Sequence, residues 1–116
     1  MRVTDCLFCK IVAGEVPADK VFENDEVLAF HDIRPQAPVH VLLIPKKHIA
    51  SAQDVTAEDA PLIGRLQAIV PEVAEKLGVA KQGYRLVTNI GWHGQQTVAH
   101  LHYHLVGGRQ LAWPPG

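Results

Sequence analysis

Residues 89–109 read NIGWHGQQTVAHLHYHLVGGR, in which His100, His102 and His104 alternate with apolar residues. Successive side chains of a β-strand point to opposite faces. This alternation therefore predicts a strand with three imidazoles on one face and apolar side chains packed on the other. The segment 94–97, Gly-Gln-Gln-Thr, comes just before it and is rich in hydrogen-bond donors. Imidazoles beside a donor-rich loop are typical of a site for an anion.

The composition is that of an ordinary globular protein. The chain has 116 residues, of which 47% are hydrophobic and 20% charged, so we expect a single domain over residues 1–116. The formal net charge is -1 and there is no basic run, which argues against a nucleic-acid partner. The longest apolar run, 39–44, is only strand length, and residues 1–5 contain no apolar signal core. We therefore expect a cytoplasmic protein with no membrane partner.

The remaining periodicities predict an α+β fold. Apolar residues recur every three or four positions over 59–77, which predicts one long helix that Pro71 should kink or split. Its start, 56–59, has the form of a capping box. A short N-terminal helix over 5–12 would be capped by Thr4 or Asp5. Together with the histidine strand, segments 20–23, 26–32, 39–44 and 84–88 predict a five-stranded antiparallel sheet.

Several of these residues also have plainer interpretations. The three alternating histidines could be metal ligands, or a solvated strand face. Cys6 and Cys9 form a CxxC pair, which could be two buried thiols, a redox pair or half of a metal site. His40 interrupts an apolar strand and could be a core imidazole bonded to a backbone carbonyl. Asp32 could simply start the proline loop that follows it.

The chain resembles a known family at several motifs. HLHYHLV at 100–106 fits the His-φ-His-φ-His-φ-φ signature of the histidine triad (HIT) superfamily, where φ is an apolar residue. The segments FHDI, PQAP, IPKKHI, GGRQ and WPPG are similar to the Hint branch, the histidine triad nucleotide-binding proteins, and cover almost the whole chain from Cys6. The resemblance implies a single HIT domain over 1–116. It also implies a homodimer in which the two sheets merge through the long helix and the strand at 84–88.

The resemblance further implies a purine nucleoside phosphoramidase that forms a nucleotidyl-histidine intermediate on His102. The catalytic residues that it implies are His102, His104, His40 and Thr97. Asp32 would bind the ribose, and Gln96, Thr97 and Asn89 would hold the phosphate. The implied nucleotide-binding residues are Phe8, Ile11, Val16, His31, Asp32, Ile33, Asn89, Gln96, Thr97, Val98, His102, His104 and Trp113. Trp113 would reach the partner's active-site region, and Gln95 stands where close relatives often have Gly.

A structural zinc ion is the one cofactor that the resemblance implies. Its ligands would be Cys6, Cys9, His48 and His100, a Cys₂His₂ set of the kind that zinc prefers. No cofactor is expected for catalysis. Three other functions stay open: a dinucleoside polyphosphate hydrolase, a regulatory protein that binds purine nucleotides, and a metal-binding module in which the histidines are ligands only.

Overall fold

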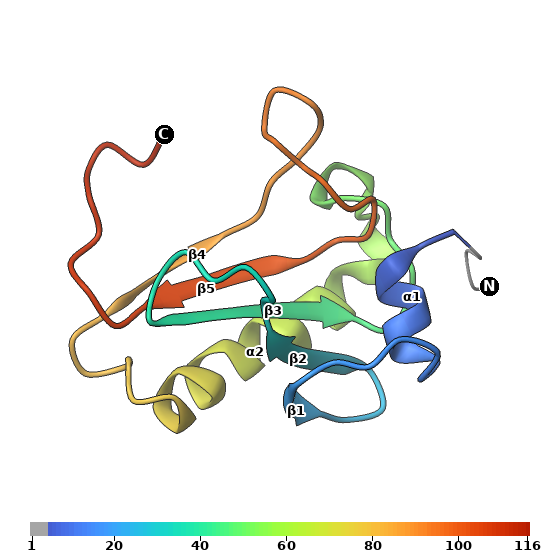
Figure 1. The fold of residues 1–116 in the computed structure, drawn as a ribbon. Helices are drawn as coiled ribbons and strands as arrows, with labels where there is room; N and C mark the ends of the chain where they lie inside the picture. Colours follow the sequence, from blue (N-terminus) through green and yellow to red (C-terminus); the bar gives the residue numbers. More distant parts are fainter. Residues whose placement is uncertain (1–4) are drawn as a thin grey trace.

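A computed structural model describes residues 5–116 of the chain. One sheet of five antiparallel strands, in the order β1-β2-β3-β5-β4, forms its centre (Figure 1). Two helices and two single 3₁₀ turns complete the fold, which confirms the predicted α+β class. The elements are α1 (Leu7–Val12), β1 (Lys20–Glu23), β2 (Val27–His31), β3 (Val39–Pro45), η1 (Ala52–Asp54), η2 (Ala57–Asp59), α2 (Ala60–Lys76), β4 (Tyr84–Val87) and β5 (Tyr103–Gly107).

The sheet separates two apolar clusters. The side chains of β3 alternate, so Val41 and Leu43 pack in the cluster that contains α2, whereas Leu42 and Ile44 pack in the cluster that contains α1. Every residue of β3 after Val39 is buried, as predicted for a central strand covered on both faces. Figure 1 shows α1 near the end of β3. The short helix leaves part of its face of the sheet uncovered, and the candidate site lies there.

Helix α2 follows its predicted course, but Pro71 does not split it. The capping box is present, with reciprocal bonds between Thr56 and Asp59, and the helix runs unbroken through Pro71. Pro71 and Gln67, whose carbonyl loses its helical partner, are both exposed, so that carbonyl can bond to water. The buried stripe that holds the helix on the sheet continues on both sides of the proline through Leu62, Leu66, Val70, Val73 and Ala74.

The prediction that all three histidines share one strand is wrong. β5 begins at Tyr103, so only His104 lies in it, and the last pairs of its two ladders are Leu43 with Tyr103 and Val87 with His104. The backbone before Tyr103 bonds elsewhere. The Leu101 N–H donates to the Ile49 carbonyl over 2.6 Å, and the Thr88 hydroxyl donates to the His102 carbonyl over 2.9 Å.

The cap of helix α1 also differs from the prediction. Cys6 is the N-cap, and its Sγ accepts a hydrogen bond from the Cys9 N–H over 3.3 Å. Its backbone is extended, with φ -81° and ψ 117°, as a capping residue requires. Asp5 does not cap the helix, and Thr4 lies outside the described residues.

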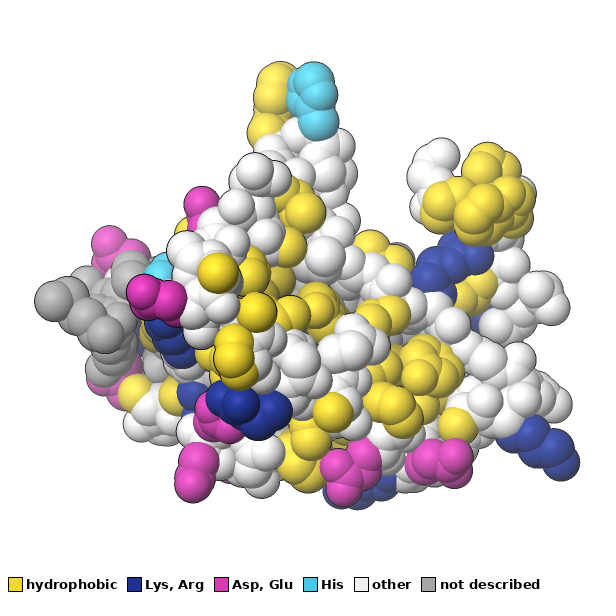
Figure 2. Space-filling model, turned by 180° about the vertical axis from the view of Figure 1, so that it is seen from behind, with side chains coloured by type: hydrophobic (Ala, Val, Ile, Leu, Met, Phe, Trp, Pro, Cys, Tyr) yellow, Lys and Arg dark blue, Asp and Glu magenta, His cyan; other side chains and the backbone are white. Residues whose placement is uncertain are grey.

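Two segments project from the body of the protein (Figures 1 and 2): the loop between β4 and β5, and the C-terminal tail. They carry the two tryptophans of the chain, and Trp92 is 86% and Trp113 80% exposed. Within residues 5–116, no helix is both long and apolar enough to cross a membrane.

Candidate active site and metal centre

A pocket of about 570 Å³ lies between α1, the end of β2 and the segment that leads into β5. Many residues singled out in the sequence line it: Phe8, Ile11, Val16, His31, Asp32, Ile33, Thr97, Val98, His102 and His104. A cavity of similar size, about 610 Å³, lies at the other end of β5, but its lining has no histidine, cysteine or acidic residue. The pocket beside α1 is therefore the candidate active site.

The inner wall of this pocket is aromatic. The Phe8 ring meets the Phe30 ring edge-on at 5.5 Å between centroids and the His102 ring at 5.1 Å. Phe30 and Leu42 line the pocket but were not singled out in the sequence. They lie two residues from Asp32 and His40, so the period of two in each strand could have identified them.

Within residues 5–116, His102 has a hydrogen bond at one ring nitrogen and none at the other. Its Nδ1 lies 2.7 Å from the His100 carbonyl oxygen, which can only accept, so Nδ1 carries the proton and Nε2 keeps a lone pair. Burial lowers the pKa of His102, which favours the neutral ring at pH 7. A neutral imidazole with a free Nε2 in a pocket is a competent nucleophile.

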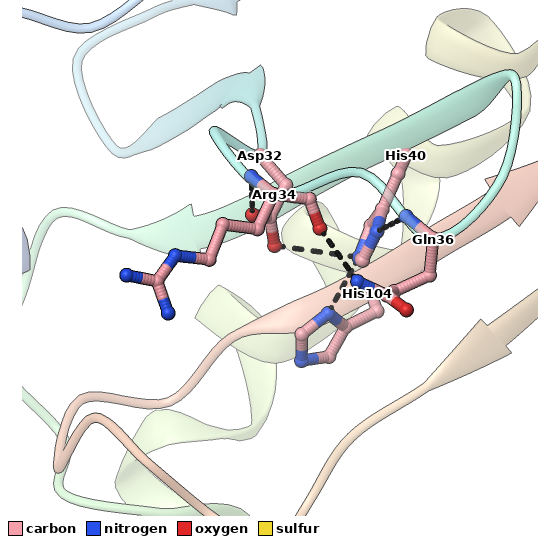
Figure 3. Close-up of polar contacts among 5 residues, drawn as sticks. All are labelled: Asp32, Arg34, Gln36, His40 and His104. Atoms are coloured by element: carbon pink, nitrogen blue, oxygen red, sulfur yellow. Dashed lines mark hydrogen bonds and ion pairs between the residues drawn. The ribbon is translucent and has the colours of Figure 1, made fainter.

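His104 joins His40 and Asp32 in a polar cluster at the pocket (Figure 3). His40 Nε2 lies 2.9 Å from His104 Nδ1 and 3.4 Å from Asp32 Oδ2. The other carboxylate oxygen, Oδ1, accepts from the Arg34 N–H over 2.8 Å, which fixes the Asp32 side chain. Burial is the main reason that the pKa of His104 falls to about 4. His40 does not itself line the pocket.

Two residues predicted to hold phosphate brace the loop before β5. The Asn89 amide donates to the Gly94 carbonyl over 2.7 Å. The Gln96 amide donates to the carbonyls of Ala50 and Val98, and its oxygen accepts from the Gly91 N–H. Neither residue lines the pocket. In the same loop Gln95 has φ 63°, the left-handed conformation that favours glycine.

A second cluster lies next to the pocket. Cys6, Cys9, His48 and His100 each place one ligand atom within 4.8 Å of the others. Cys6 Sγ is 3.3 Å from His100 Nδ1, and Cys9 Sγ is 3.3 Å from His48 Nδ1. The two Nδ1 atoms are 3.2 Å apart. Both thiols are free.

This cluster fits a tetrahedral metal ion. Zinc bonds of about 2.3 Å to sulfur and 2.0–2.1 Å to nitrogen place adjacent ligand atoms of a tetrahedron roughly 3.3–3.8 Å apart. His100 Nε2 lies 2.8 Å from the Pro45 carbonyl oxygen, so it carries the proton and Nδ1 offers its lone pair to the cluster. Burial raises the pKa of the Cys6 thiol, and a bound cation would oppose that effect. The four residues could therefore hold a metal.

Comparisons with known proteins identify the family of the chain. A family model described as scavenger mRNA decapping enzyme C-term binding matches residues 5–111. A HIT-like protein of Synechococcus elongatus is 54% identical over 112 residues, which are 97% of each chain. The chain belongs to the histidine triad superfamily. Purine nucleoside phosphoramidase of Escherichia coli is 46% identical over 92% of this chain and 90% of its own length.

Solved structures of histidine triad proteins share the fold closely. A HIT family hydrolase of Legionella pneumophila is 53% identical and superimposes with a TM-score of 0.94, over 97% of this chain and all of its own. A histidine triad protein of Clostridium difficile is 41% identical, with a TM-score of 0.93 over 97% of each chain.

Trp113, which was predicted to bind nucleotide, lies outside the pocket of its own chain.

Proposed function

We propose that this histidine triad protein hydrolyses the P–N bond of purine nucleoside 5′-phosphoramidates. The observation that carries the proposal is the state of His102, whose Nδ1–H is held by the His100 carbonyl over 2.7 Å while Nε2 is free in the pocket. The 46% identity to a purine nucleoside phosphoramidase supports the choice of substrate class.

The pocket offers a surface for each part of such a substrate. Phe8, Ile11 and Val16 form an apolar slot suited to a purine. The Asp32 carboxylate, at the end of β2, would accept hydrogen bonds from the ribose hydroxyls. The phosphate would then lie between the donor groups of Thr97 and His104, beside His102 Nε2.

The reaction proceeds in two displacements. His102 Nε2 attacks the α-phosphorus, an Nε2–P bond forms and the P–N bond breaks, and the amine leaves after taking one proton from the solvent. Water then attacks the same phosphorus, the Nε2–P bond breaks and the water gives one proton back to the solvent, which releases the nucleoside monophosphate and restores the neutral imidazole. The His100 carbonyl can stabilise the positive charge on the ring in the intermediate, because it accepts the Nδ1–H throughout.

A fluorogenic adenosine phosphoramidate tests this function. We expect wild-type protein to release the amine and His102→Ala to lose more than about a thousandfold in kcat/KM. His93→Ala is the matched control, because His93 is exposed on the projecting loop. Adenylated His102 should be detectable by mass spectrometry after acid-free rapid quenching. Wild-type protein that hydrolyses no phosphoramidate would refute the proposal, and preferential cleavage of dinucleoside polyphosphates would replace it.

We also propose that Cys6, Cys9, His48 and His100 bind a structural zinc ion. The 3.2–3.3 Å spacings of their facing atoms support it, and a reducing cytoplasm would keep both thiols available. The ion would hold α1 against the segment before β5. Plasma emission should find about one zinc per chain, and Cys6→Ala/Cys9→Ala should hold none. Metal-free wild-type protein from zinc-replete medium would refute this site.

We further propose a homodimer through β4. This strand ends the sheet order, and all four of its residues are half-buried in the single chain. Pairing with a second copy would satisfy the backbone groups of this edge. Sedimentation equilibrium should give twice the chain mass, and a concentration-independent monomer would contradict the proposal.

A further inference from the structure

The polar cluster beside the pocket contains a chain of hydrogen bonds that starts in the proline loop. The Gln36 backbone N–H lies 3.0 Å from His40 Nδ1, and His40 Nε2 lies 2.9 Å from His104 Nδ1 (Figure 3). His40 is on β3 and His104 on β5, where His104 pairs with Leu42. The two imidazoles are therefore diagonal neighbours on the pocket face of the sheet.

The first bond fixes where His40 carries its proton. A backbone N–H can only donate, so His40 Nδ1 must accept with its lone pair. A protonated Nδ1 would bring two donors together at 3.0 Å, which excludes the other tautomer and the imidazolium. The proton of His40 is therefore on Nε2.

The second bond passes this constraint to His104. With the proton on His40 Nε2, His104 Nδ1 must accept, so the single proton of a neutral His104 lies on Nε2. Figure 3 shows this second nitrogen on the side of the ring away from His40. Within residues 5–116 no hydrogen bond to His104 Nε2 occurs, and His104 lines the pocket. Nε2–H is thus free to meet a ligand.

The same three side chains could be interpreted as a metal site, since Asp32, His40 and His104 offer one ligand atom each. A neutral His40 that binds a metal through Nε2 must carry its proton on Nδ1. That proton would face the Gln36 N–H at 3.0 Å. The proline loop therefore favours proton positioning over metal binding at this cluster.

We propose that the Gln36 backbone amide, acting through His40, holds His104 in the Nε2–H tautomer so that a donor faces the phosphate of the ligand. The inference rests on the proposed function for the presence of that phosphate. His40 is a positioning residue, and Gln36 acts only through its amide. In the opposite tautomer a lone pair on His104 Nε2 would face an anionic oxygen and repel it.

The arrangement also limits what His104 can do chemically. Burial lowers its pKa to about 4, so the ring is neutral at pH 7 and has one proton to offer. To release that proton it would have to become an anion, because His40 cannot deliver a second proton while the Gln36 N–H occupies its Nδ1. His104 therefore donates a hydrogen bond to the phosphate and does not protonate the leaving amine.

Long-range ¹H–¹⁵N spectra of the full chain, labelled at histidine nitrogen, test the tautomers without any substrate. We expect a protonated Nε2 and an unprotonated Nδ1 for both His40 and His104. Gln36→Pro removes the amide hydrogen and should mix the tautomers of both rings, whereas Gln36→Ala keeps the hydrogen and should leave them unchanged. An Nδ1–H tautomer at His104 in the wild-type protein would overturn the proposal.

Ligand binding tests the consequence. His40→Ala should weaken AMP binding by about tenfold or more, the size of a lost hydrogen bond to a charged group. Adenosine has no phosphate but keeps the ribose that Asp32 would bind, so His40→Ala should weaken adenosine binding clearly less than AMP binding. His40→Gln, whose amide can still donate to His104, should recover part of the AMP affinity.

Three outcomes of these measurements would overturn the inference. Equal losses for AMP and adenosine in His40→Ala would show that His40 supports the pocket generally. Coordination of added Zn²⁺ by the His40 and His104 rings of zinc-loaded protein would favour the metal interpretation. Absence of AMP binding to wild type would remove the phosphate role, whereas AMP binding without turnover would refute only the proposed hydrolysis.

Discussion

Gly94 lies where the loop before β5 folds back on itself, and a side chain there has no room. A Cβ at this position would lie 2.3 Å from the Ile90 carbonyl oxygen and 2.9 Å from the Ile90 nitrogen. Favourable contacts between non-bonded heavy atoms begin near about 3.5 Å, so the loop would have to open by roughly 1 Å. Both obstacles are backbone atoms, so no side chain can rotate away to make space.

The cost of Gly94→Ala follows from these contacts. Overpacking by one methyl group typically costs about 1–3 kcal/mol. Opening the loop also strains the 2.7 Å bond from the Asn89 amide to the Gly94 carbonyl, which contributes about 1 kcal/mol. We expect the free energy of unfolding to fall by about 2–3 kcal/mol. The same displacement moves Thr97 and Val98 in the pocket, so kcat/KM for a phosphoramidate should fall about tenfold.

Urea denaturation and steady-state kinetics measure both effects. Gly64→Ala is the matched control, because it adds the same methyl group to α2, where a Cβ meets nothing within 4 Å. It should raise the free energy of unfolding by up to about 1 kcal/mol through helix propensity. A Gly94→Ala protein with the same urea midpoint of unfolding and the same kcat/KM as wild type would refute the reasoning.

Further predictions concern the loop, the core and pH. Gln95→Gly should stabilise by about 0.5 kcal/mol, because relief of its left-handed φ of 63° slightly exceeds the added unfolded-state entropy; a lower Tm would contradict this. Leu43→Ala, at a fully buried position, should cost about 3 kcal/mol by urea denaturation, and a loss below about 1 kcal/mol would be inconsistent with its burial. The pKa of His104 is about 4 when folded and near 6.5 when unfolded, so between these values the unfolded chain binds more protons and stability falls as pH is lowered. The slope of Tm against pH should be smaller in His104→Gln; an equal slope would argue against the lowered pKa.

Periodicity was sufficient to predict most of the fold because the long helix buries a regular stripe and the central strand β3 is an unbroken buried run. It failed at residues 100–102, where backbone groups bond to the loop after β3 and to a threonine hydroxyl. The alternation of residue types shows which side chains point to the same side of an extended chain. An extended segment that pairs with no neighbouring strand shows the same alternation as a strand in a sheet. The sequence pattern therefore cannot locate the end of a ladder.

The candidate site shows a similar limit. The four residues Cys6, Cys9, His48 and His100 could be grouped from the sequence through their spacing and the family signature. The amide of Gln36 could not, because every residue except proline has one and only the path of the proline loop aims it at His40. The roles of Asn89 and Gln96 as loop braces likewise depend on where the loop turns.

Helix α1 contributes to two sites within one turn. Cys6 and Cys9 belong to the cluster of cysteines and histidines that could hold a metal, while Phe8 lies between them in sequence, with its ring centroid 5.9 Å from that of His100 and 5.1 Å from that of His102. A metal bound by Cys6 and Cys9 and a nucleotide held against Phe8 would therefore both contact this one short segment. Thermodynamic linkage requires that any change the metal makes in the nucleotide affinity equal the change the nucleotide makes in the metal affinity. With such a coupling, metal availability would set the apparent affinity for the nucleotide, and nucleotide concentration would set how firmly the metal is retained.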